Sequence, residues 1–145
     1  MTLKPKHLLL ALLITLAPAA FAQDEEEAEQ EQQQEPGITD YIAMEPPFVT
    51  HVGEPGTRLT YLKAAVTLRA SRETTRPAVE AHMPRLRHEL VMLFGEQTDT
   101  QGLSGNKGQQ ALREEAASRI NAVLEEQQTG ESITGVLFTE FVVQK

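Results

Sequence analysis

Two stretches of the chain alternate between apolar and polar side chains, which is the pattern of a half-buried β-strand. Between residues 58 and 70 every second position is apolar, namely Leu62, Ala64, Val66, Leu68 and Ala70. A period of two puts these side chains on one face, so one face of this strand should enter the core. Residues 48 to 52 predict a second, shorter strand, because two prolines precede them and the turn-rich sequence GEPG follows them. We expect the two strands to form a hairpin or a neighbouring pair.

The positions between 74 and 95 predict a helix that contains a break. Thr74 or Thr75 offers an N-cap, and Pro77 suits a first helical turn. Pro84 should kink or restart the helix, because proline lacks the backbone N–H that a helix interior needs. Gly95 should end it. The apolar residues at helical spacing in this segment are Val79, Met83, Leu86, Leu90, Leu93 and Phe94.

A second helix is expected after a polar connection at residues 96 to 102. It should begin near Ser104, and Gly130 stands where a glycine commonly follows a helix end. Apolar residues recur through this segment at the spacing of one helix face: Leu112, Ala116, Ile120, Val123 and Leu124.

Residues 133 to 144 return to a strand pattern in which both faces are apolar apart from Thr139 and Glu140. We therefore expect this last strand to be central in the sheet or covered on both sides. The order strand, strand, helix, helix, strand predicts an α+β domain of about a hundred residues, with two helices packed on a small sheet. The expected core residues are Phe48, Leu62, Val66, Leu68, Leu86, Leu90, Leu112, Ile120, Val136, Phe138 and Phe141.

Residues 1 to 22 form a candidate targeting segment. Lys4 and Lys6 precede a mainly apolar run at residues 8 to 22, which ends in the small-residue pattern AFA. This arrangement predicts a secretory signal peptide that is cleaved between Ala22 and Gln23. A short, uncleaved membrane anchor is the alternative, although the run is shorter than the roughly 20 apolar residues that span a bilayer.

Residues 23 to 40 are predicted to be an acidic linker, followed by the domain at residues 41 to 145. Seven carboxylates and no basic residue lie between positions 23 and 35, so this tract should be disordered. It is either a solvating spacer or a docking tail for a basic partner. The formal net charge of −8 and the 5% aromatic content argue against nucleic acid as a partner. Because the chain has no cysteine, disulfides and thiolate chemistry are excluded.

Known catalytic and metal-binding motifs are incomplete in this sequence. The segment HELVM resembles the start of the zinc motif HExxH, but Met92 stands where the second histidine is required. His82 and His88 are spaced to point to different sides of a helix, and His51 lies on a predicted strand. The sequence GNKG lacks the remainder of a phosphate-binding loop. We therefore predict no enzyme activity, no metal and no cofactor, although carboxylates distant in sequence could still meet in the fold.

Several segments occur in the order and spacing of a known family. They are Tyr41, the triplet PFV with Pro47 and Phe48, LTYLKA, MPRLRHELV, GQQALREE with Leu112, and VLFTEFVVQ with Phe138, Thr139, Phe141 and Gln144. Over residues 41 to 144 the chain resembles the periplasmic domain of the FliL family of flagellar basal body-associated proteins. The terminal strand F-T-x-F-V-x-Q is the most specific part of this resemblance.

The resemblance implies a non-enzymatic role beside the flagellar motor. It implies a domain in the periplasm, at or near the inner membrane, that associates with stator and motor proteins and with its own copies as a ring. Such a protein would support flagellar rotation, motility and chemotaxis, and its fold would be like that of stomatin and prohibitin. The chain departs from typical members in its short, cleavable-looking N-terminal segment and at Thr50 and His51, where members often have asparagine followed by an apolar residue.

A ring of identical domains needs a head-to-tail interface, and arginine is favoured at interfaces. Arg85, Arg87 and Arg113 are therefore the candidate interaction surface, although each also suits an ordinary position that faces solvent. The alternative function is a periplasmic scaffold or binding module of the same fold without a flagellar role, because a fold does not fix a function.

Overall fold

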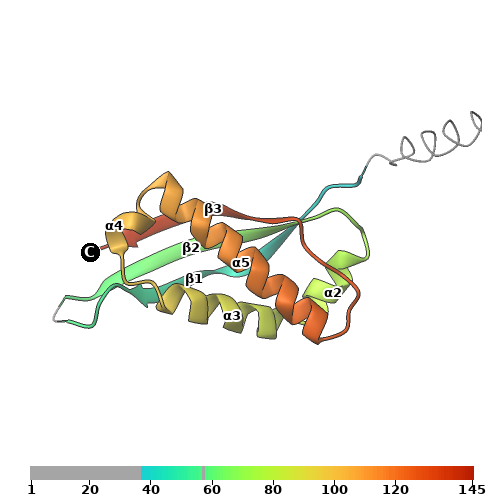
Figure 1. The fold of residues 1–145 in the computed structure, drawn as a ribbon, viewed down its shortest axis with the longest axis horizontal. Helices are drawn as coiled ribbons and strands as arrows, with labels where there is room; N and C mark the ends of the chain where they lie inside the picture. The colour runs from blue at the N-terminus through green and yellow to red at the C-terminus, as the bar shows by residue number, and fades with distance from the viewer. Residues whose placement is uncertain (1–36, 57) are drawn as a thin grey trace, which may run out of the picture. The chain divides into compact units, whose positions relative to one another are not determined.

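A three-stranded sheet and the helices on one of its faces make up residues 37–56 and 58–145, which a computed structural model describes (Figure 1). The predicted signal segment and most of the predicted linker lie outside these residues. The α+β class is confirmed, whereas the likeness to stomatin and prohibitin stays a prediction. The elements are β1 (Asp40–Val52), β2 (Thr60–Ala70), α2 (Thr75–Ala81), α3 (Met83–Gly95), α4 (Thr100–Leu103), α5 (Asn106–Glu126) and β3 (Gly135–Gln144).

β2 is the central strand and pairs antiparallel with β1 on one side and β3 on the other. Its alternate residues from Leu62 to Ala70 are buried, which confirms the predicted inward face. The pairing of β1 with β2 is confirmed too, but β1 is longer than predicted and its register shifts between Met44 and Phe48. Helix α3 packs over β1 and α5 packs over β3, so the two long helices cover the same face of the sheet (Figure 1).

β3 lies at an edge of the sheet, so the prediction of a central strand or one covered on both sides was wrong. The reason is a β-bulge at Thr139. Phe138 pairs with Val66 and Glu140 pairs with Ala65, so Thr139 is skipped in the strand register, although its hydroxyl donates to the carbonyl oxygen of Ala65 at 3.4 Å. One extra residue reverses the inward and outward alternation beyond it.

The bulge brings large residues from both halves of β3 to the side that faces the helices. These residues are Val136, Phe138, Phe141 and Val143. Leu137 and Val142 remain on the outer side, where 37% and 39% of their surfaces are exposed. The apolar content of β3 thus reflects a shift of alternation rather than a second covering layer.

The breaks in the helical region follow the predicted signals. Thr74 precedes α2, Pro84 lies in the first turn of α3, and α3 ends at Gly95. The predicted polar connection contains one short helix that the sequence pattern did not indicate. This helix, α4, begins where the Asp99 carboxylate accepts a hydrogen bond from the backbone N–H of Gly102 at 2.9 Å.

The corner between α4 and α5 depends on a close backbone approach at Gly108. A Cβ atom on this residue would lie 2.0 Å from the Gly102 carbonyl oxygen, a distance that no side chain tolerates. The corner directs Leu103 into the core, where it is 4% exposed.

Aromatic rings cross the core from β1 to β3 and join the helices to the sheet. Phe94 of α3 packs edge to face on Phe48 of β1, with ring centroids 5.5 Å apart, and on Phe138 of β3 at 6.1 Å. Phe138 stacks on Phe141 at 5.0 Å. Phe94 is fully buried, and nine of the eleven predicted core residues are buried, whereas Phe138 and Phe141 at the edge strand are partly buried.

Two carboxylates fasten α2 to the rest of the domain. The Arg76 guanidinium donates to both oxygens of Asp40 at the start of β1, with Nε 3.0 Å from Oδ2. Glu131, in the loop before β3, accepts a hydrogen bond of 2.8 Å from the hydroxyl of the buried Thr75. The bond from Arg76 lowers the pKa of Asp40, and bonds from Thr74 and Thr75 lower the pKa of Glu131.

Replacing Phe94 with alanine should lower the free energy of unfolding by about 3–5 kcal/mol, because the change leaves a cavity where α3 meets both edge strands. Urea denaturation followed by circular dichroism measures this loss. Met92→Ala, on the same helix at a side chain that is 49% exposed, is the control and should change stability by no more than about 0.5 kcal/mol. Equal losses in the two variants would contradict the described core.

Stability is expected to fall in acid. The pKa values of Asp40 and Glu131 are lower in the folded state than in the unfolded state. Their contribution to the stability of the fold is therefore fully present above the ordinary pKa of a carboxyl group, which is about 4. It is lost as the pH falls through the lowered values. Asp40→Asn should therefore shrink the difference between urea midpoints measured at neutral pH and in acid. Glu73→Gln, which alters an exposed carboxylate without an ion pair in the described domain, is the control. An unchanged difference in Asp40→Asn would refute this role.

Candidate functional site

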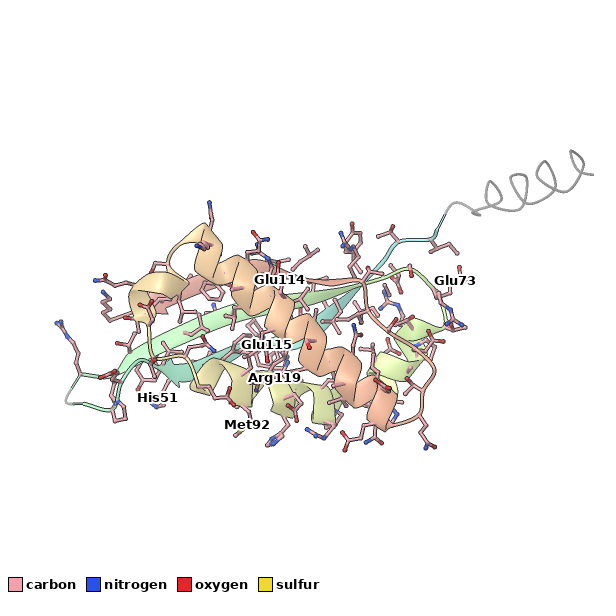
Figure 2. The ribbon with its side chains drawn as sticks, in the orientation of Figure 1. His51, Glu73, Met92, Glu114, Glu115 and Arg119 are labelled. Carbon is pink, nitrogen blue, oxygen red and sulfur yellow. The ribbon has the colours of Figure 1, made fainter. Side chains whose placement is uncertain are left out.

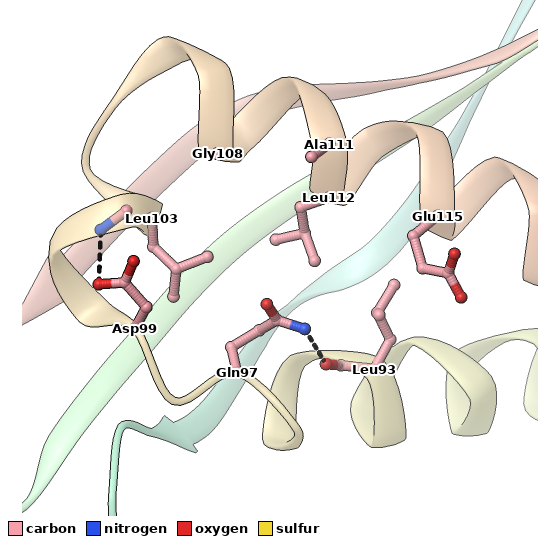
Figure 3. A pocket seen from close by; sticks show the side chains of 9 residues that line it. Leu93, Gln97, Asp99, Leu103, Gly108, Ala111, Leu112 and Glu115 are labelled. Carbon is pink, nitrogen blue, oxygen red and sulfur yellow. Dashed lines mark hydrogen bonds between the residues drawn. The ribbon is translucent and has the colours of Figure 1, made fainter.

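A shallow pocket lies where α3, α4 and α5 meet, with a volume of about 280 Å³ (Figure 3). Leucine side chains from all three helices line its apolar part: Leu93, Leu103 and Leu112. Gln97, Asp99 and Glu115 supply its longer polar side chains. The pocket thus combines an apolar floor with two carboxylates.

The polar groups of the pocket already hold the helices in place. Asp99 caps α4, and the Gln97 side-chain amide donates to the carbonyl oxygen of Leu93 at 2.9 Å. The Glu115 carboxylate accepts a hydrogen bond from Nε of Arg119 at 3.0 Å. The residues that line this pocket include no serine, histidine or lysine, so they do not form a nucleophile and base pair.

Arg119 links the end of α3 to the middle of α5 (Figure 2). Its guanidinium lies between two carboxylates, donating to both oxygens of Glu96 at 2.7 and 3.2 Å and to Glu115. The hydrogen bonds from Arg119 lower the pKa of Glu96, and those to both carboxylates raise the pKa of Arg119. Glu96 and Arg119 are therefore charged at neutral pH, and this cluster fixes two helices rather than supplying an acid or a base.

The histidines lie apart from one another. His51 packs against Tyr61 on the outer side of the sheet, with ring centroids 4.5 Å apart, His82 lies between α2 and α3, and His88 is exposed on α3. Within residues 37–56 and 58–145 no three or more metal-ligating side chains come together.

Two of the three predicted interface arginines cover phenylalanine rings at opposite sides of the helical layer. The Arg87 guanidinium lies 4.1 Å from the ring centroid of Phe48 and donates to the carbonyl oxygen of Met44, so it lies over β1. The Arg113 guanidinium lies 5.9 Å from the ring centroid of Phe138, over β3.

Arg85 lies elsewhere, between α3 and the end of α5. It pairs with Glu89 one turn later, and its Nη2 lies 3.8 Å from Glu126. The three arginines therefore do not share one patch, and each has a contact within its own chain. Whether they also contact a partner stays a prediction.

Sequence reasoning missed the outer face of the sheet as a surface of interest. Five of the nine large apolar side chains with high exposure in the described domain lie on this face, opposite the helices: Tyr41, Val49, Tyr61, Leu137 and Val142. We call this surface, formed by the outward side chains of β1, β2 and β3, the open face. The apolar residues at the outward positions of the strands are the signal that could have identified this face. In β3 they were interpreted as evidence that the strand is covered on both sides.

The helices of the described domain are all too short or too polar to span a bilayer.

Residues 41–144 match the family model described as flagellar basal body-associated protein FliL. Flagellar protein FliL of Escherichia coli strain K12 and that of Shigella flexneri are each 29% identical to the chain over 97 residues. The match covers 67% of this chain and 60% of each relative, so it spans less than two thirds of the relatives' length.

The matched residues run from the second residue of β1 to the last residue of β3 and so contain every helix described above. The predicted resemblance is thereby confirmed over the whole sheet and helical layer. The chain belongs to the FliL family of flagellar basal body-associated proteins.

Proposed function

We propose that this chain is a non-enzymatic accessory of the flagellar basal body that contacts motor and stator proteins in the periplasm, near the inner membrane. The observation that carries the proposal is the family match over the whole described domain, at residues 41–144. Through these contacts the protein would support flagellar rotation and hence motility and chemotaxis. The residues predicted to be a signal peptide would bring the domain to the periplasm.

The described side chains support a role in contact rather than in chemistry. The charged groups beside the pocket hold α3, α4 and α5 together, and Arg119 is already paired with two carboxylates. The less committed surfaces are the open face and the two free strand edges of β1 and β3. Sheet edges and exposed apolar side chains are surfaces that proteins use for association.

Self-association as a ring would use two different sides of the domain. A head-to-tail contact joins one surface of a copy to another surface of the next copy. Arg87 beside β1 and Arg113 beside β3 lie at opposite sides of the helical layer, so they would belong to the two different surfaces of such a contact.

Deleting the gene in its own bacterium should reduce swimming and swarming, and a plasmid copy should restore them. Motility in soft agar and the rotation of tethered cells measure the effect. A tagged copy, fractionated and sequenced from its N-terminus, should begin at Gln23 if the signal peptide is removed and at Met1 if it remains as an anchor. Normal motility of the deletion strain would instead favour a scaffold without a flagellar role.

The combined variant Arg85→Ala, Arg87→Ala and Arg113→Ala should lower motility when it replaces the natural chain, because it removes the three candidate contact residues. Arg87 and Arg113 also pack on aromatic rings, so thermal unfolding must show that the variant remains folded. Arg58→Ala, an exposed arginine in the connection between β1 and β2, is the matched control. A folded triple variant with normal motility and normal self-association would rule out this surface.

A further inference from the structure

The open face carries five large, exposed apolar side chains, although no layer covers it within the described domain. Antiparallel sheets commonly bury one face and present polar side chains on the other. Here Tyr41 is 55% exposed and Val49 64% exposed on β1, with Leu137 and Val142 across the sheet on β3. Exposed apolar side chains that gather on one face are a feature of interaction sites.

Charges of both signs lie side by side in the middle of the open face. Nζ of Lys63 on β2 lies 3.1 Å from Oε1 of Glu140 on β3, and the two side chains are 48% and 43% exposed. A partner with a single sign of charge would meet one attractive and one repulsive group there. A surface that carries the same two charges in reverse order would meet two attractive groups.

We infer that the open face packs against the open face of a second copy of this chain, sheet on sheet, around a two-fold axis. A two-fold interface uses the same patch on both copies and must therefore be self-complementary. The neighbouring lysine and glutamate satisfy this condition, and the apolar side chains around them supply the buried surface.

The strand register defines where the axis lies. Lys63 stands opposite Val142, and the next outward row has Ala65 opposite Glu140. An axis that crosses the strands between these two rows places each Lys63 beside the other copy's Glu140. It also places the end of the sheet with Tyr41 over the opposite end of the other sheet, with the two sheets about 10 Å apart.

The size of the face makes this pairing weak. Three strands about 4.8 Å apart and about ten residues long at about 3.3 Å per residue cover a flat area of about 450 Å². A stable interface buries about 800 Å² on each partner. The pair should therefore form only at high protein concentration. The proposed pair uses neither strand edge. The inference rests on the open face alone and does not depend on the proposed flagellar role.

The first test is the oligomeric state of the purified full chain from micromolar to millimolar concentration, by sedimentation equilibrium. A reversible dimer is expected. Val142→Lys should weaken it about tenfold or more, because the change buries a charge in the interface. Val91→Lys, at a valine of similar exposure on α3, is the matched control and should leave the dimer unchanged.

A charge exchange provides the second test. Lys63→Glu leaves two glutamates on each open face and Glu140→Lys leaves two lysines, so each variant alone should dimerise about tenfold more weakly or worse than the natural chain. An equal mixture of the two variants should dimerise again. Because the chain has no cysteine, Ala65→Cys should also cross-link two copies through a bis-maleimide, whereas Ser118→Cys on the exposed side of α5 should not.

A chain that stays monomeric across the concentration range would overturn the inference, and protection of the open face in that monomer would assign the face to the chain's own N-terminal segment. A dimer that is insensitive to Val142→Lys, or a mixture of charge variants that fails to associate, would overturn it as well. These measurements contain no motility readout, so they fail or succeed independently of the proposed function.

Discussion

The architecture depends on the contact of one ring, Phe94, with both edge strands of the sheet. This ring meets Phe48 on β1 and Phe138 on β3, although the two strands are separated by β2. A helix that touches both edges holds them on a common surface, and α5 then fills the space beside it. The same arrangement places both long helices on one face, because the aromatic side chains of all three elements point there. The other face therefore carries only the outward side chains of the three strands.

The helices cover only one face of the sheet, and this difference between the two faces bears on the proposed function. In the described domain the charged groups near the pocket join helices to one another, and the histidines are scattered. What distinguishes the molecule is its surface: a sheet face with exposed tyrosine, valine and leucine, and two strand edges that pair with nothing in the described domain. These are the surfaces through which the proposed contacts would be made.

Local signals in the sequence sufficed for much of the fold. The alternation in β2 identified its buried face, and Pro84 and Gly95 marked helix boundaries, because each acts on its immediate neighbours. The position of β3 could not be read in the same way. A single unpaired residue, Thr139, reverses the alternation, and nothing in the local composition distinguishes a bulge from an ordinary threonine in a strand.

The surfaces were harder to predict for a related reason. Arg87 and Arg113 suggested an interface by residue type, yet the rings they cover, Phe48 and Phe138, lie more than twenty positions away in the chain. The carbonyl partner of Arg87, on Met44, is equally distant in sequence. The open face required knowing which side the helices cover. The short helix α4 was missed as well, although aspartate, the residue type of Asp99, is common at a helix N-cap.

The pairing of Arg76 with Asp40 has a mechanical consequence. Asp40 is the first residue of β1, so tension in the chain that precedes it reaches the domain at this residue. Without the ion pair, that load would fall on the end of an edge strand and would open its hydrogen bonds one after another. The guanidinium of Arg76 also holds the carbonyl oxygen of Tyr41, and it thereby passes part of the load to α2. The start of β1 is thus tied both to β2 and to α2.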